Sequence, residues 1–338
     1  MVRIGVIGLG RIGKVHIRSI STRIKDAKVV MAADPFLNEE MSEFAKGFGI
    51  EHLTKDYKEI INHKDIDAVL ICSSTDTHAQ ISAEAIRAGK HVFCEKPVDH
   101  SLEKIKIVQD ALAENPVKFQ VGFNRRYDHN FSAIREAVEA GKIGEVHVTK
   151  ITSRDPNPPS AEYAAVSGGM LLDMTIHDFD MVRFLTGAEP VSIYVEPAVL
   201  VDPAIGEAGD IDTAIITMKM SDGSIAVIDN SRKAAYGYDQ RAEVFGSGGM
   251  AANKNDSAST CVISDEDGVR GEKPLYFFLE RYMDSFALEV SEFVDAIIHD
   301  KPIRTGIEAG LRAVVIALAG NKSIKEKRRV EIKEVYEA

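Results

Sequence analysis

The chain has 338 residues, 45% of them hydrophobic, which is long enough for two domains. Its formal net charge of −11 at pH 7 argues against binding to the phosphate backbone of nucleic acids. No apolar run approaches the ~20 residues of a membrane-spanning helix, and Met1–Gly10 lacks a signal-peptide pattern, so we expect a cytoplasmic protein with neither nucleic acid nor membrane as a partner.

The cysteines are few and odd in number: Cys72, Cys94 and Cys261. None has a partner at the spacing of a metal site, so no metal centre is predicted. Cys72 and Cys94 end apolar runs, where a free thiol behaves as a small hydrophobic side chain. This pattern favours a reducing compartment.

The first third of the chain alternates short apolar runs with amphipathic segments. Continuous apolar strands separated by helices indicate a parallel sheet covered on both faces. We therefore predict an α/β domain over residues 1–123. The expected strands are Val2–Ile7, Val29–Ala33, Ala68–Cys72, His91–Cys94 and Lys118–Val121, and the expected helices are Arg11–Ser21, Asn38–Lys46, Thr77–Ala88 and Leu102–Ala113.

After residue 123 the pattern changes to strands framed by helices. Ser221-Asp222-Gly223 is a hairpin turn signal. An α+β domain over residues 124–338, with a large open and mostly antiparallel sheet, is predicted. Its last helix is a candidate to pack back on the first domain. The expected helices are Phe131–Ala140, Leu171–Leu185, Phe286–His299 and Glu308–Ser323, and the expected strands are Gly144–Ser153, Ile211–Met220, Ser224–Ser231, Glu243–Phe245 and Thr260–Ile263.

The sharpest local motif is Gly8-Leu9-Gly10-Arg11-Ile12-Gly13, between the first strand and the first helix. Gly8 permits the tight turn, Gly10 lets a pyrophosphate approach the backbone, and Gly13 lets the helix pack on the strand. The helix N-terminus favours the anion. Gly8, Gly10, Arg11, Ile12 and Gly13 are candidate cofactor contacts, and the competing interpretation is a glycine-rich turn without a ligand.

Asp34 supplies the second half of this signature. It follows the second strand, 21 residues after Gly13, where a carboxylate accepts hydrogen bonds from the adenosine ribose. A carboxylate there repels a 2′-phosphate, and neither Pro35 nor Phe36 offers a positive charge. The sequence therefore predicts that residues 1–123 form a dinucleotide-binding (Rossmann) domain, with NAD rather than NADP as the cofactor.

A second loop follows the strand Ala68–Cys72. Strand ends of this kind line the ligand crevice of open α/β sheets. Its hydroxyls can contact the nicotinamide ribose, or Thr77 can cap the next helix, and both can hold. The candidate cofactor contacts in this loop are Ser73, Ser74, Thr75 and His78.

Two further patterns suggest catalysis. Lys96, in Glu95-Lys96-Pro97, follows a strand and is placed to point into the crevice, although an exposed surface lysine is an equal alternative. Asp173 and His177 lie four apart in a helical segment, so they share one helical face. His177 can take a hydroxyl proton, and a neighbouring carboxylate can hold its ring. The alternative is a solvated acidic face.

Together, the glycine motif, Glu95-Lys96-Pro97 and the stretch 168–178 (GGMLLDMTIHD) resemble the glucose-fructose oxidoreductase / inositol dehydrogenase / rhizopine catabolism (Gfo/Idh/MocA) family. The resemblance covers essentially the whole chain. Residues 122–128 (GFNRRYD) and 235–240 (AYGYDQ) are most similar to the myo-inositol 2-dehydrogenases of that family.

The resemblance implies roles for individual residues. Lys96, Asp173 and His177 would form the catalytic group, with His177 as the base, Asp173 orienting it, and Lys96 holding the reacting oxygen. Arg126, Asp155 and Tyr236 match positions that line the inositol pocket, and Glu95 and Lys96 also belong to the cofactor side. The family relationship further implies NAD-dependent oxidation of myo-inositol to 2-keto-myo-inositol by a homotetramer packed through the open face of the second sheet.

One stretch departs from the pattern of some inositol dehydrogenases. Ser153-Arg154-Asp155-Pro156 has a carboxylate where those enzymes have histidine and asparagine. An ionised Asp155 accepts but does not donate hydrogen bonds, which leaves the substrate isomer open. The alternatives are a dehydrogenase of scyllo-inositol, of another isomer or of an aldose, and a regulator that binds NAD without turnover.

Overall fold

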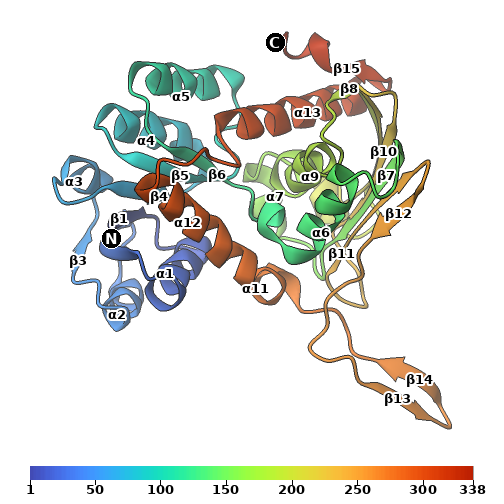
Figure 1. Cartoon of the computed structure of the whole chain (residues 1–338), viewed down its shortest axis with the longest axis horizontal. Coiled ribbons are helices and arrows are strands. Elements are labelled where there is room, and N and C mark those ends of the chain that lie inside the picture. Colours follow the sequence, from blue (N-terminus) through green and yellow to red (C-terminus); the bar gives the residue numbers. More distant parts are fainter. Residues whose placement is uncertain (338) are drawn as a thin grey trace. The chain divides into compact units, whose positions relative to one another are not determined.

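The computed structural model describes residues 1–337, in two compact units (Figure 1). Unit 1 comprises Met1–Tyr127 and Met283–Val314, and unit 2 comprises Asp128–Tyr282 and the chain from Val315 onwards. Both units are discontinuous in sequence. The domain division between residues 123 and 124 stays a prediction.

Unit 1 is built on a six-stranded parallel sheet with strand order β3-β2-β1-β4-β5-β6. This order reverses between β1 and β4, which is the topological switch point of a dinucleotide-binding fold. The Rossmann fold predicted from the sequence is therefore confirmed. The strands are β1 (Val2–Ile7), β2 (Ala27–Ala33), β3 (His52–Thr54), β4 (Ala68–Ile71), β5 (His91–Glu95) and β6 (Phe119–Gly122).

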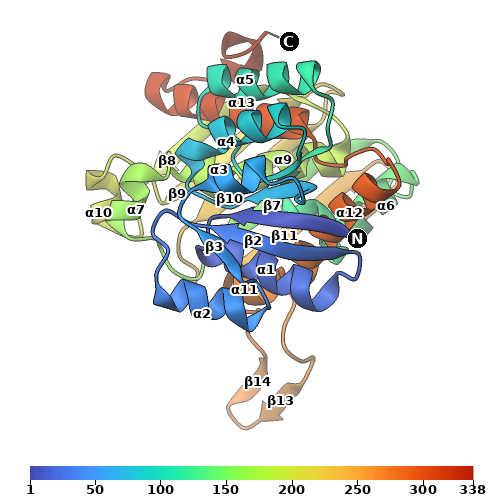
Figure 2. The same ribbon diagram turned by 90° about the vertical axis from the view of Figure 1, so that its left-hand side faces the viewer.

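Helices cover both faces of this sheet, with α4 and α5 on one side and α1 and α2 on the other (Figure 2). Val290, Phe293 and Val294, from a segment far along the chain, are fully buried in the same apolar core as β1. The helices of unit 1 are α1 (Arg11–Arg23), α2 (Glu39–Gly47), α3 (Tyr57–Asn62), α4 (Thr75–Arg87), α5 (Leu102–Glu114), η1 (Asn124–Tyr127) and α12 (Met283–Ile298).

Unit 2 is built on a seven-stranded sheet with strand order β12-β11-β7-β10-β9-β8-β15. All neighbouring strands are antiparallel except β7 and β10. The predicted hairpin is present, with Gly223 at φ +89° in the turn between β9 and β10. The strands are β7 (Val146–Arg154), β8 (Pro190–Ala198), β9 (Thr213–Met220), β10 (Ile225–Ser231), β11 (Asp239–Gly246), β12 (Gly249–Ala252) and β15 (Val330–Glu331).

The two faces of this sheet differ. Helices of the same unit lie on one side (Figure 1), where side chains such as Ile216 and Ile228 are buried. The opposite face, here called the open face, exposes the side chains of Val148, Ile215, Ile225 and Phe245. The helices of unit 2 are α6 (His129–Glu139), α7 (Ala161–Val166), α8 (Met170–Asp173), α9 (Ile176–Thr186), α10 (Pro203–Glu207), α11 (Phe277–Arg281) and η2 (Ile332–Glu334), and α13 (Ile307–Glu326) runs from unit 1 into unit 2.

Two predicted elements differ in the structure. The single helix Leu171–Leu185 is wrong, because Met174 and Thr175 form a turn between α8 and α9. Thr260–Ile263 does not continue the large sheet. Instead, β13 (Val262–Asp265) pairs with β14 (Gly268–Gly271) in a separate hairpin whose strand residues are all exposed, so neither strand has a buried face with which to join the sheet.

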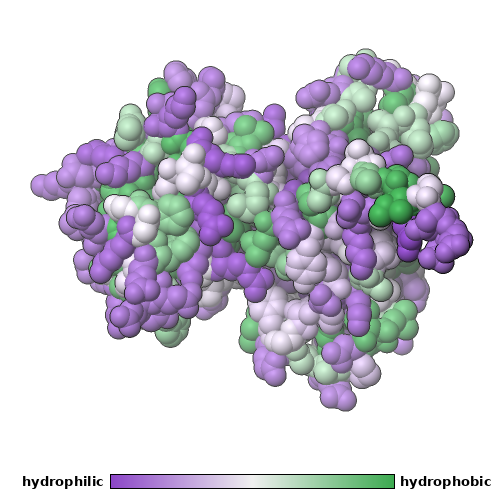
Figure 3. All heavy atoms as spheres, turned by 90° about the horizontal axis from the view of Figure 1, so that it is seen from below, coloured by the Kyte–Doolittle hydropathy of each residue, from purple (hydrophilic) through white to green (hydrophobic). Residues whose placement is uncertain are grey.

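Hydrophilic side chains dominate the face of the molecule in Figure 3, where hydrophobic ones form scattered patches. No helix within residues 1–337 is both long enough and apolar enough to span a membrane. Cys72 and Cys94 are buried, as their apolar surroundings predict, and Cys261 is exposed.

Candidate functional site

The candidate cofactor residues of unit 1 gather at one edge of its sheet. Because β1, β2, β4 and β5 run parallel, the loops that follow them meet at the same edge. These loops carry the glycine motif, Asp34, Ser73–Thr75 and Lys96. Arg126 lies in η1, directly after β6, and therefore belongs to the same edge.

The glycine loop has the geometry that a phosphate site needs. Gly8 has φ +101°, and a Cβ there would lie 2.5 Å from the carbonyl carbon of Cys72. A Cβ on Gly13 would lie 2.0 Å from the carbonyl oxygen of Gly8. Gly10 instead faces open space, and as the N-cap of α1 it makes no side-chain cap. The loop thus presents a helix N-terminus that has no side-chain cap, which fits a pyrophosphate.

The carboxyl group of Asp34 accepts a hydrogen bond from the backbone of the glycine loop. Its Oδ2 accepts from the backbone N–H of Leu9 at 2.8 Å, and its Oδ1 accepts from that of Phe36 at 2.9 Å. The residue is 7% exposed. A carboxylate has about four acceptor positions, so two remain for ribose hydroxyls. Asp34 therefore supports the glycine loop as well as the predicted ribose contact.

In the loop that follows β4, two side chains make hydrogen bonds within unit 1 that the sequence did not indicate. Helix α4 begins at Thr75 with Ser74 as N-cap, so Thr77 is not the cap, and its hydroxyl donates to the Ser74 carbonyl at 2.7 Å. The ring of His78 is 2% exposed and lies between two carbonyl oxygens, 2.8 Å from that of Pro97 and 3.0 Å from that of Ser73. His78 thus joins the loops that follow β4 and β5.

Glu95 and Lys96 end the fifth strand. Glu95 is 7% exposed and lies 2.7 Å from Nε2 of His16 on α1. Gly122 makes room for its carboxyl group, since a Cβ there would lie 3.0 Å from it. Lys96 is half-buried, its backbone N–H donates to Glu95 Oε2 at 3.3 Å, and its peptide bond to Pro97 is cis. The alternative of a freely exposed surface lysine therefore does not hold.

Asp173 and His177 flank the turn between α8 and α9 in unit 2. The turn is anchored to the covered face of the sheet, where the Thr175 hydroxyl donates to Asn230 Oδ1 at 2.7 Å and the Asn230 amide donates to Asp178 at 2.9 Å. Thr175, Asn230 and Asp178 are 0% exposed. The solvated acidic face considered from the sequence is therefore wrong.

The sequence interpretation missed Arg232, which joins two of the predicted residues. Its guanidinium donates to Asp173 Oδ2 at 3.0 Å and to Asp155 Oδ2 at 3.4 Å. The Arg232 side chain is 4% exposed. Burial lowers its pKa, but the charges of Asp173 and Asp155 outweigh burial and raise it. A single arginine after a strand carries no motif, so only its neighbours in space identify it.

Tyr163 completes the surroundings of Asp173. Its hydroxyl donates to the second carboxyl oxygen, Oδ1, at 3.1 Å. Asp173 therefore accepts from both a cation and a neutral donor, which favours its ionised form. The Asp155–Arg232–Asp173 group, here called the arginine clamp, brings together two predicted residues, one directly after β7 and the other at the end of α8.

Tyr236 lies in a different setting. Its hydroxyl donates to Asp239 at 2.5 Å and accepts from Arg154 at 3.1 Å. Arg154 and Asp239 are register partners with side chains on the open face. Burial, followed by the bond to Asp239, raises the pKa of Tyr236. The described contacts of Tyr236 thus lie outside the arginine clamp, and its pocket role stays a prediction.

Two segments of the chain match models of known protein families. Residues 2–123 match the model of an oxidoreductase family with an NAD-binding Rossmann fold. Residues 131–252 match the GFO/IDH/MocA C-terminal domain.

Individual relatives agree. The myo-inositol 2-dehydrogenase of Thermotoga maritima is 45% identical over 333 residues, covering 98% of this chain and 99% of the relative. The crystal structure of a probable dehydrogenase from Thermotoga maritima aligns with a TM-score of 0.96 at 45% identity, over 99% of this chain and 100% of that one.

A third relative was solved with ligands. The scyllo-inositol dehydrogenase of Lactobacillus casei, with bound NAD(H) and scyllo-inositol, aligns with a TM-score of 0.91 at 32% identity, over 98% of this chain and 99% of that one. With full-length relatives at this identity and matches to both family models, the chain belongs to the Gfo/Idh/MocA family of NAD-binding oxidoreductases.

Proposed function

We propose that this protein oxidises myo-inositol to 2-keto-myo-inositol with NAD as the hydride acceptor. The observation that carries the proposal is the 45% identity to a myo-inositol 2-dehydrogenase over 98% of the chain, in a protein that keeps Lys96, Asp173 and His177. The role of each residue follows from the contacts that it makes within its own unit.

The cofactor residues are those at the carboxyl edge of the first sheet. Bound NAD would supply the hydride acceptor. The backbone N–H groups at Gly10, Arg11 and Ile12 would hold its pyrophosphate, and Asp34 its adenosine ribose. The bare N-terminus of α1 and the two free acceptor positions of Asp34 support this assignment.

His177 would accept the proton of the reacting hydroxyl while the C–H hydrogen leaves with its electron pair, giving a ketone, NADH and a proton. Lys96 would hold the reacting oxygen through its ammonium group. Asp173, kept ionised by Arg232 and Tyr163, would orient His177 and stabilise its charged ring. The same residues serve scyllo-inositol or an aldose equally well, and the scyllo-inositol dehydrogenase relative favours scyllo-inositol as the second candidate.

The test is NADH formation by purified protein across a panel of inositol isomers and hexoses. We expect myo-inositol to give the highest kcat/KM, with NAD preferred over NADP. Preference for scyllo-inositol or a hexose would move the assignment to that substrate. Tight NAD binding with no reduction by any polyol would establish the non-catalytic regulator instead.

We also propose a homotetramer in the cytoplasm, acting in carbohydrate metabolism. The four exposed apolar side chains on the open face, Val148, Ile215, Ile225 and Phe245, support assembly through this face. Three free cysteines are consistent with a reducing compartment. Light scattering of I225D, with a matched I225V control, tests the tetramer: only the charged variant should dissociate.

A further inference from the structure

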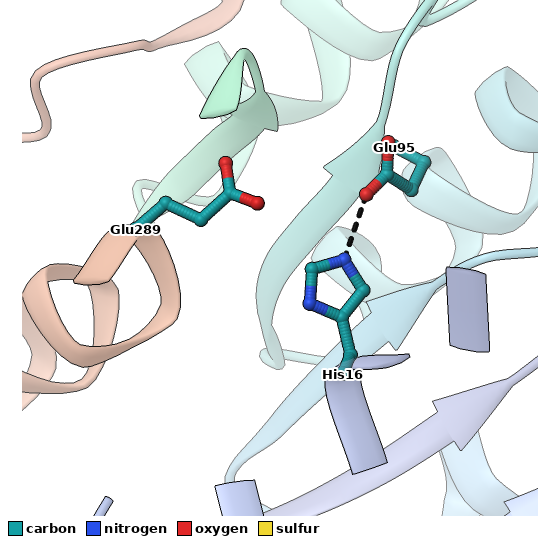
Figure 4. A group of neighbouring side chains, drawn as sticks. All are labelled: His16, Glu95 and Glu289. Carbon is teal, nitrogen blue, oxygen red and sulfur yellow. Dashed lines mark hydrogen bonds and ion pairs between the residues drawn. The ribbon is translucent and has the colours of Figure 1, made fainter. Parts of the chain in front are cut away.

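A buried group of three ionisable side chains lies beside Lys96 in unit 1. His16 comes from α1, Glu95 ends β5, and Glu289 lies on α12, with exposures of 0%, 7% and 0%. One nitrogen or oxygen atom from each side chain lies within 4.8 Å of the other two. Figure 4 shows the Glu289 carboxyl group pointing towards the His16–Glu95 pair. The motifs found in the sequence include neither His16 nor Glu289.

The charges of this group do not balance if both glutamates are ionised. His16 and Glu95 form one hydrogen-bonded pair, with 2.7 Å between Nε2 and Oε1, so the group holds at most one positive charge against two carboxyl groups. Neither carboxyl oxygen of Glu289 has a hydrogen-bond partner among residues 1–337. A buried carboxylate without a partner is costly, and the charge of Glu95 adds repulsion. Burial, followed by the charge of Glu95, raises the pKa of Glu289 well above its ordinary value.

Within residues 1–337, the contacts around this group supply no cation besides His16 itself. The aromatic rings of Phe93 and Phe286 contact His16 edge-on. Cys72 and Tyr127 are the other titratable groups affected by the charge of Glu289, and burial raises the pKa of both, so both are neutral at pH 7. Apart from the ring of His16, whose Nδ1 has no hydrogen-bond partner among residues 1–337, the remaining proton donor of this cluster is the carboxyl group of Glu289 itself.

We propose that Glu289 is a neutral carboxylic acid that, together with His16, positions Glu95 and through it Lys96. The His16–Glu95 pair ties α1, the helix of the glycine loop, to β5, the strand that ends beside Lys96. Because the Lys96 backbone N–H donates to Glu95 Oε2 at 3.3 Å, a displaced Glu95 carboxyl group also displaces Lys96. Glu289 and His16 are thus positioning residues. Only the role of Lys96 rests on the proposed function.

The protonation of Glu289 can be tested without any turnover. In E289Q, an amide replaces a neutral acid of the same shape. The unfolded wild type releases this proton above a pKa near 4.5, whereas the folded protein keeps it, so wild-type stability falls as the pH rises. Stability measured by denaturant from pH 5 to pH 8 should therefore shift progressively in favour of E289Q. E292Q, at a half-exposed glutamate of the same helix, is the matched control and should show no such trend.

Infrared spectroscopy gives a direct readout. The C=O stretch of a protonated carboxyl group should be present in the wild type and E292Q at neutral pH and absent from E289Q. Absence of this band from the wild type, or a stability difference independent of pH, would overturn the proposal. One equivalent of a metal ion in the purified wild type but not in E289Q would also overturn it, because a cation would then replace the proton.

Positioning is tested by comparing E289L with E289Q in the steady state. E289L has no hydrogen-bond donor and should lower kcat about tenfold, with the KM for NAD changed by less than about twofold. E289Q should restore most of the lost kcat. Equal losses in both variants, or none in E289L, would contradict the positioning role. If the wild type oxidises no polyol, the proposed function fails, while the stability and infrared results still decide the state of Glu289.

Discussion

The candidate sites of the two units consist of different kinds of groups. In unit 1 the site consists mainly of backbone: a glycine loop, a bare helix N-terminus and the ends of parallel strands. In unit 2 it consists of buried charges, with Arg232 between Asp155 and Asp173. A backbone site is encoded by contiguous residues, whereas an ion network is encoded by residues that meet only after folding. The first can therefore be recognised in a sequence and the second cannot.

The difference also predicts how each site tolerates change. A backbone site loses one contact when one side chain is removed. Removing one charged side chain from the arginine clamp costs more, because the remaining buried charges then lack a partner of opposite sign. Single substitutions in unit 2 should therefore have larger effects than those in unit 1.

His177 provides the largest expected effect and tests whether a residue of unit 2 accepts the proton of the reacting hydroxyl. H177A should lower kcat about 10²- to 10⁴-fold, since a general base typically contributes that much. The affinity for NAD, measured by calorimetry, should not change, because the candidate cofactor residues all lie in unit 1. H299A, at an exposed histidine, is the control. Turnover within about tenfold of the wild type, under ~1.4 kcal/mol of barrier, would show that His177 is not the base.

Arg232 gives the most direct test of the contrast between the units. R232M should lower the free energy of unfolding by about 3 kcal/mol, because Asp155 and Asp173 keep their charges without the cation. It should also reduce kcat/KM about 100-fold, as Asp173 loses its orientation. R232K keeps the charge but not the two-pronged geometry, so an intermediate value is expected for both quantities.

The matched control for Arg232 is Arg328 of the same unit, which forms an ion pair with Glu326 in which the two side chains are 44% and 36% exposed. Chemical denaturation of R328M should show a clearly smaller loss of stability than that of R232M. Equal losses would mean that the clamp contributes no more than a surface ion pair, and the contrast between the two units would fail.

The sequence predicted unit 1 well because its signals are local. The alternation of strands and helices, the glycines and Asp34 each describe a contiguous segment whose structure follows from its own residues. The ends of the five predicted strands lie within a few residues of those in the structure, whereas β3 and α3 were not predicted. His16 was missed even so, since its partner Glu95 is 79 residues away.

Unit 2 was predicted less completely because its details depend on tertiary contacts. The apolar period of Leu171–Leu185 indicates one helix, and the hydrogen bond from Thr175 to Asn230, 55 residues away, accompanies the turn that divides it. Similarly, Asp178 and Asp180 read as solvated in the sequence and are buried in the fold. Their partners come from other segments, which no local pattern identifies.

Asp34 provides the corresponding test in unit 1. D34A should weaken NAD binding about tenfold, as expected for lost hydrogen bonds to a charged group, while NADP is affected less because the repulsion of its 2′-phosphate also disappears. The Leu9 N–H loses its acceptor with either cofactor, so the ratio of the two dissociation constants is the informative quantity. D26A, at an exposed aspartate before β2, is the control. An unchanged ratio would refute the ribose contact.

The last expected effect concerns acid, and it separates the two units by the sign of their pH dependence. Asp239 is 0% exposed, and although burial raises its pKa, hydrogen bonds from Arg241, Tyr236 and Asn255 hold it at about 2. A depressed pKa gives stability that is present above the unfolded value near 3.8 and lost as the pH falls through 2.

D239N should therefore lose about 2 kcal/mol less stability than the wild type between about pH 5 and pH 2, and D267N, in an exposed turn, should follow the wild type. Parallel acid profiles for D239N and the wild type would contradict the depressed pKa. Glu289 in unit 1 has the opposite sign, because its raised pKa costs stability as the pH rises. The E289Q and D239N variants should thus change opposite ends of the pH profile, and their double variant should show both changes independently if the two clusters do not interact.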